Sequence, residues 1–152
     1  MVNMKKILTG TAAFILSAAL IAGCGSKELD MTSAANEILS GASFAEQLQP
    51  ASENIALKRL GINAADVESC VAYASTNAVV DEFAVVKATN AANVESAIRS
   101  HIEQQSATYS SYAPNEVPKL ESAVVKTVGD YVIYVVSSDN ASAQALVDGL
   151  TK

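Results

Sequence analysis

The spacing of apolar positions changes along the chain, and these changes separate helical from extended segments. In residues 31–40 and again in 53–60 an apolar side chain recurs every three or four positions, which predicts two amphipathic helices. Asp30 precedes the first segment and Ser52 the second, and both residue types cap helix N-termini. A glycine follows each segment, as is common at helix C-termini. A further helical turn is expected from Asn63.

Four later segments instead favour extended structure because they are rich in Val, Tyr and Thr. Residues 70–75 and 79–88 form one predicted strand pair, and residues 123–128 and 131–137 form a second. The glycine-first dipeptide at residues 129–130 suits a type II′ turn. Both connections are too short for anything but a hairpin, so each pair is expected to be antiparallel.

A long helix separates the two strand pairs, and a shorter helix closes the chain. The long helix is expected to begin after Thr89 or Asn90 and to end before Pro114, while the closing helix follows Asp139 or Asn140. The element order is therefore ααββαββα. This order predicts an α+β fold in which helices pack on a mainly antiparallel, four-stranded sheet of two hairpins.

Both faces of this sheet carry apolar side chains, which leaves two interpretations. Phe83 and Val85 share one face of their strand, and Ala84 and Val86 share the other. Either helices cover both faces, with the two N-terminal helices behind and the long helix in front, or one face is a docking surface for a peptide, a lipid or a protein. In the second case the candidate partner surface consists of Val80, Glu82, Ala84, Val132 and Tyr134.

The N-terminal region has the order of parts of an export signal. Lys5 and Lys6 precede residues 7–22, which carry no charge and are fewer than the roughly 20 residues that an untilted transmembrane helix needs. The sequence Ile-Ala-Gly-Cys ends at Cys24 and resembles the lipobox of bacterial lipoproteins. The resemblance implies cleavage between Gly23 and Cys24 and transfer of a diacylglyceryl group to the Cys24 thiol, with palmitate among the acyl groups.

This reading divides the chain into a signal peptide over residues 1–23, a lipidated tether over residues 24–30 and a single domain over residues 31–152. It places the mature protein on the extracytoplasmic face of the cell membrane, held there by its N-terminal lipid. The whole chain has a formal net charge of −6, and the charge becomes more negative when both signal lysines are removed. Its basic residues are scattered, which argues against nucleic acid as a partner.

Candidate catalytic chemistry is sparse. Cys70 has no basic neighbour in sequence and is expected to be structural, and His101 borders an apolar helix stripe, as expected of a histidine at the core edge or surface. Asp81 and Glu82 are adjacent, so strand alternation sends them to opposite faces, and we expect them at a strand edge. No catalytic, metal or cofactor site is therefore assigned, and no cofactor is expected.

Four stretches carry a second resemblance: residues 81–87, the long helix with Arg99 inside it, residues 112–114 and residues 129–132. Through them the chain resembles a family of small lipoproteins, mostly from low-GC Gram-positive bacteria, known as domain-of-unknown-function family 4358. That family has no accepted activity, ligand or catalytic residue, so the resemblance implies one extracytoplasmic domain and no site.

These observations predict a lipid-anchored, non-enzymatic module that binds or scaffolds another envelope protein or a cell-wall component. One alternative is an envelope enzyme or an enzyme inhibitor whose site the sequence does not reveal. Another is a small-molecule receptor for a transporter, which is disfavoured because such receptors usually need two lobes. An uncovered patch at the candidate partner surface would favour binding, and a deep pocket gathering His101, carboxylates and a hydroxyl would favour catalysis.

Overall fold

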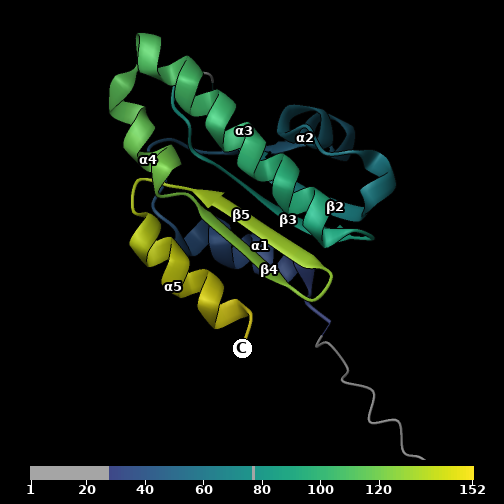
Figure 1. Cartoon of the computed structure of the whole chain (residues 1–152). Coiled ribbons are helices and arrows are strands. Elements are labelled where there is room, and N and C mark those ends of the chain that lie inside the picture. Colours follow the sequence, from purple (N-terminus) through teal and green to yellow (C-terminus); the bar gives the residue numbers. More distant parts are fainter. Residues whose placement is uncertain (1–27, 77) are drawn as a thin grey trace, which may run out of the picture.

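The computed structural model describes residues 28–76 and 78–152, which form an α+β fold around one antiparallel sheet (Figure 1). The order of strands across the sheet is β1-β2-β3-β5-β4, so β3 lies at the centre. The predicted signal peptide and the first part of the predicted tether lie outside the described residues. The strands are β1 (Gln49–Ala51), β2 (Val67–Ala74), β3 (Glu82–Ala88), β4 (Val124–Val128) and β5 (Tyr131–Val136).

The antiparallel arrangement agrees with the prediction, but the sheet has five strands instead of four. The additional strand, β1, pairs with β2 and places Gln49 opposite Ala74 and Ala51 opposite Ala72. It is only three residues long and contains Pro50, which lacks an N–H and is tolerated at a sheet edge. A segment of three residues is too short to show the alternation of apolar and polar side chains that predicts a strand, so the sequence did not predict β1.

The two predicted hairpins are present and join through β3 and β5. Only two residues connect β4 to β5; Gly129 has a φ of +56° and Asp130 does not have a positive φ, as a type II′ turn requires. Residues 79–81 were predicted to belong to a strand, but they precede β3. The backbone N–H of Val80 donates to the side chain of Glu116 at 3.1 Å, and the backbone oxygen of Asp81 accepts the N–H of Ser75 at 2.9 Å. The segment is therefore held both by the 3-10 turn before α4 and by the residue that follows β2.

The helix ends follow local sequence signals. Asp30 accepts hydrogen bonds from the backbone N–H groups of Thr32 and Ser33 at 3.0 and 3.1 Å. Ser52 occupies the N-cap of the second helix without a side-chain bond, and Gly61 ends that helix with a φ of +66°. The helices are α1 (Met31–Gly41), α2 (Glu53–Leu60), α3 (Ala91–Tyr112), α4 (Val117–Glu121) and α5 (Asn140–Leu150), with 3-10 turns at Ala64–Asp66 and Pro114–Glu116.

Helices cover both faces of the sheet (Figure 1). On one face α1 and α5 lie side by side over an apolar cluster that includes Ile38, Phe83 and Val85. On the other face α2, α3 and α4 cover a second cluster that includes Ala84 and Ile98. The covered-sheet interpretation is therefore correct, but the two N-terminal helices lie on opposite faces and not together, as had been expected.

The long helix α3 spans 22 residues and remains polar on its outer side, where Arg99 pairs with Glu95 at 2.7 Å. An apolar stripe through Val94 and Ile98 faces the sheet. In the part of the chain that the structure describes, no helix combines the length and the apolar character needed to cross a membrane.

Candidate functional site

The predicted partner surface is not a surface. Its five side chains are almost completely buried, because α2 and α3 pack over them. Alternation along a strand reveals which residues share a face, but not which helix will cover that face. The exposed fractions are 3% for Val80, 4% for Glu82, 1% for Ala84, and 0% for both Val132 and Tyr134.

Two adjacent carboxylates at the start of β3 are the most unusual feature of the interior. Asp81 is 0% exposed and Glu82 is 4% exposed. Their carboxylates have separate sets of partners. The expected position at a strand edge is wrong for Glu82, the first residue of β3, because β3 is central, and Asp81 precedes that strand. A buried carboxylate is costly unless it is paired and hydrogen-bonded, so each must have its own set of partners.

Glu82 and its partners form a compact cluster, called the Glu82 cluster below, that joins four elements. Oε1 accepts hydrogen bonds from His101 Nε2 on α3 at 2.6 Å and from the Tyr134 hydroxyl on β5 at 2.9 Å. Oε2 lies 2.7 Å from Nε of Arg59 on α2. The single carboxylate therefore connects α2 and α3 to β3 and β5.

The electrostatics keep this carboxylate ionised. Burial alone would raise the pKa of Glu82, but the hydrogen bond and charge of His101 and the charge of Arg59 outweigh that effect and lower the pKa below its ordinary value. Burial, reinforced by the Glu82 charge, raises the pKa of Tyr134 well above its ordinary value, so the phenol stays protonated and donates its hydrogen bond.

The Glu82 cluster contains groups suited to proton transfer, but it offers little room for a substrate. The cavity beside it has a volume of about 10 Å³ and is lined partly by Arg59, Glu82 and Tyr134. That volume is close to the minimum for a single water molecule. His101 is 4% exposed, so it lies in the interior and not at the core edge or surface. The geometry favours a structural role for the cluster.

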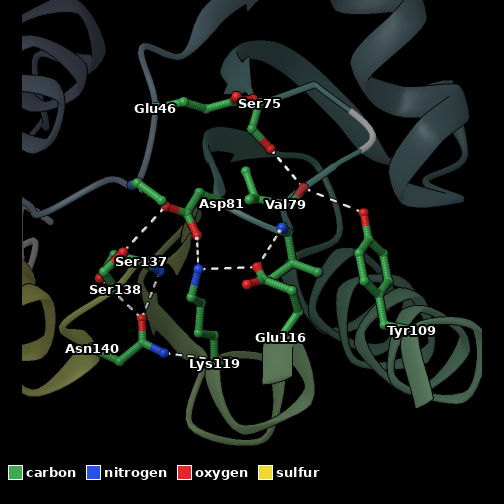
Figure 2. A network of polar contacts seen from close by, with 12 residues as sticks. Glu46, Ser75, Val79, Asp81, Tyr109, Glu116, Lys119, Ser137, Ser138 and Asn140 are labelled. Atoms are coloured by element: carbon green, nitrogen blue, oxygen red, sulfur yellow. Dashed lines mark hydrogen bonds and ion pairs between the residues drawn. The ribbon is translucent and has the colours of Figure 1, made fainter. Parts of the chain in front are cut away.

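Asp81 organises a second group of contacts, called the Asp81 network below (Figure 2). Its Oδ1 lies 3.0 Å from Lys119 Nζ on α4, and its Oδ2 accepts the backbone N–H of Ala45 at 2.5 Å. Lys119 also pairs with Glu116 at 2.9 Å, and Glu116 accepts the N–H of Val80. Burial works against the ammonium charge, but Glu116 and Asp81 raise the pKa of Lys119 above its ordinary value.

The Asp81 network continues into the neighbouring loops (Figure 2). Asn140 donates to the backbone oxygen of Lys119 at 2.7 Å and accepts the N–H of Ser137 at 2.8 Å, which holds the start of α5 against α4. On the other side, the backbone oxygen of Val79 accepts the hydroxyls of Ser75 and Tyr109 at 2.8 and 3.3 Å. The network thus fixes several connecting segments at one end of the sheet.

The surroundings of Cys70 disfavour a reactive thiol. Burial, followed by the nearby charge of Glu53, raises the pKa of the Cys70 thiol to about 12, which disfavours the reactive thiolate. Within residues 28–76 and 78–152 no group of three or more His, Cys, Asp or Glu side chains is placed to hold a metal ion. Cys24 and Gly23 lie outside the described residues.

The sequence did not identify Arg59 or Lys119 as important, although one signal was available. Glu82 stands at an inward-facing position of a strand that is otherwise apolar, and a carboxylate there requires a partner. Nothing in the spacing reveals which cation supplies it, because Arg59 is 23 positions away and Lys119 is 38 positions from Asp81.

The fold thus defines the chain as an α+β domain with a helix-covered antiparallel sheet. Residues 42–137, more than half of the chain, match the family described as Domain of unknown function (DUF4358), and the chain belongs to that family. No curated protein and no solved structure matches it. The matched region contains both carboxylates and every partner in the Glu82 cluster. It ends before two members of the Asp81 network, Asn140 and Ser138, whose hydroxyl donates to Asp81 Oδ2 at 3.5 Å.

Proposed function

We propose that the chain is a lipid-anchored lipoprotein on the extracytoplasmic face of the cell membrane, where its domain binds or scaffolds another envelope protein or a cell-wall component. One observation carries the anchoring: Lys5 and Lys6, the uncharged residues 7–22 and a Gly-Cys pair ending at Cys24 follow one another in the order of a lipoprotein signal.

The expected modification is sufficient to hold the protein at a membrane. Each buried methylene contributes about 0.8 kcal/mol, and two acyl chains anchor stably where one alone binds only marginally. A diacylglyceryl group on Cys24 supplies two chains. Because the chain has two cysteines, modification of Cys24 as a thioether leaves Cys70 without a disulfide partner in the same chain.

The start of the fold supports a domain held close to the bilayer. The first helix begins at Met31, so seven peptide steps separate it from Cys24. Fully extended, this segment reaches at most roughly 25 Å. A partner of the domain must therefore lie at or near the outer surface of the cell membrane. This position favours an envelope component over a freely diffusing protein.

An envelope enzyme is less well supported. The grouping that resembles a catalytic site, Glu82 with His101 and Tyr134, adjoins a cavity of only about 10 Å³. Catalysis requires these groups to approach a substrate within hydrogen-bonding distance, and that volume admits no substrate larger than water. The transporter-receptor alternative lacks the two lobes that would enclose a small molecule, since the described elements build one sheet.

The two cysteines allow a matched test of the anchoring. Wild type, Cys24→Ala and Cys70→Ala are expressed in a bacterial host, and membranes are washed with carbonate and high salt. We expect wild type and Cys70→Ala to stay in the membrane and to incorporate an alkyne-labelled fatty acid, and Cys24→Ala to lose the label. Retention of the label by Cys24→Ala, or its absence from wild type, would contradict the proposal.

A further inference from the structure

A groove at one end of the molecule, called the α1–α5 groove below, lies apart from both buried networks. Its volume is about 420 Å³. The start of α1, the facing ends of β4 and β5 and the end of α5 line it. Three elements distant in sequence thus form one concavity. Its lining includes Glu28, Leu29, Glu37, Val128, Tyr131 and Leu150.

The floor of the groove is apolar and accessible. Val128 is 38% exposed and is one of three large hydrophobic side chains that the described residues leave exposed. Leu29 and Leu150 are partly buried beside it, and the ring of Tyr131 is 6% exposed. Seating an apolar side chain on this floor would remove Val128 from water, which contributes about 25 cal/mol per Å² of apolar area buried.

The rim of the groove is acidic. Glu28, Asp30 and Glu37 contribute three carboxylates, against one amine from Lys152. The Glu28 carboxylate is 83% exposed and lies 3.7 Å from Lys87 Nζ, a separation at which water screens the pair strongly. Asp30 uses one oxygen to cap α1. The excess of carboxylates favours a cationic occupant.

The position of the groove limits what can reach it. Glu28 is four peptide steps from Cys24, which is about 14 Å when fully extended. The closeness of the groove to the membrane rests on the proposed lipid anchor at Cys24. Apart from Val128 and Tyr131, the lining residues lie outside the family match over residues 42–137. The groove is therefore built mainly by the elements that flank the family region.

We propose that the α1–α5 groove receives a juxtamembrane segment of an envelope membrane protein that carries apolar and basic side chains. An apolar side chain of that segment packs on Val128 and Leu150, and Lys or Arg side chains lie against Glu28 and Glu37. An acidic rim repels the headgroups of anionic lipids, which disfavours lipid as the occupant.

A defined probe tests the chemistry. Mature protein, lipidated at Cys24, is placed in phosphatidylcholine vesicles with a transmembrane peptide whose outer juxtamembrane residues alternate Lys and Leu; the control peptide alternates Glu and Leu. We expect binding of the lysine peptide alone, measured by energy transfer. Val128→Glu should weaken it at least tenfold, whereas Ile55→Glu, at an exposed apolar position on α2, should leave it unchanged. Equal binding of both peptides, or equal effects of both variants, overturns the proposal.

Crosslinking in intact cells tests the occupant. A photoreactive residue replaces Ser33 in the groove, or exposed Ser100 on the outer face of α3 as a control. We expect adducts from position 33 alone, mapping to a peptide with basic and apolar residues next to a transmembrane helix. If the adducts formed only with lipid, only with a second copy of the chain or only with a soluble protein, the proposed occupant of the groove would be wrong. Failure of the anchor is read separately, from loss of fatty-acid labelling at Cys24.

Discussion

Asp81 and Glu82 are neighbours in sequence and are both buried, yet they stabilise different parts of the molecule. Glu82 lies beneath α2 and α3 and binds side chains from two helices and a strand. Asp81 lies at the end of the sheet and binds α4 and the backbone of the segment after α1. Glu82 thus joins helices to the sheet, whereas Asp81, the preceding residue, positions connecting segments.

The difference shows that two adjacent acidic residues in an extended segment can stabilise two separate parts of the structure. Successive side chains of an extended segment leave it in opposite directions, so Asp81, just before β3, and Glu82, its first residue, can meet two separate environments. Among the described residues, no buried side-chain nitrogen or oxygen lacks a hydrogen-bond partner, so both environments are fully satisfied. Removing one partner from either is costly because the remaining charge stays buried.

The largest effect is expected for Glu82→Ala, which leaves Arg59 and His101 without their carboxylate. Breaking a buried ion pair from one side destabilises by about 3–5 kcal/mol, and we expect a loss in this range in urea unfolding. The matched control is Glu95→Ala, which removes an exposed pair with Arg99 and should cost less than about 1 kcal/mol. Similar losses for the two variants would show that the Glu82 cluster contributes no more than a surface ion pair.

A smaller and more local effect is expected for Asp81→Asn. The amide keeps one acceptor for Lys119 but turns an N–H toward the N–H of Ala45, so about 1–3 kcal/mol should be lost. Hydrogen exchange separates the two carboxylates. Asp81→Asn should speed exchange in residues 42–48 and 114–121, and Glu82→Gln should speed it in α2 and α3. The same pattern in both variants would contradict the division of tasks.

Much of this arrangement could be predicted from the sequence, but the pairing of its charges could not. Local signals located the helix ends at Asp30 and Gly61 and the turn at Gly129. Alternation along β3 separated the two carboxylates correctly. The helices that cover each face are set by packing between distant segments, so the exposed-surface interpretation failed and the roles of Arg59 and Lys119 were missed.

The smallest effect is expected for Tyr134→Phe, which removes one of the hydrogen bonds to Glu82 and leaves its contacts with Arg59 and His101 in place. The Tyr134 hydroxyl is buried and lies 2.9 Å from Oε1, so its deletion should cost about 1 kcal/mol. Tyr73→Phe is the matched control. The Tyr73 ring stacks on Phe83 on the opposite face of the sheet, with 5.1 Å between the ring centroids, and a phenylalanine preserves that contact. We expect no more than about 0.5 kcal/mol for the control in urea unfolding. If Tyr134→Phe cost as much as Glu82→Ala, the hydroxyl and not the pairing of charges would hold the cluster together.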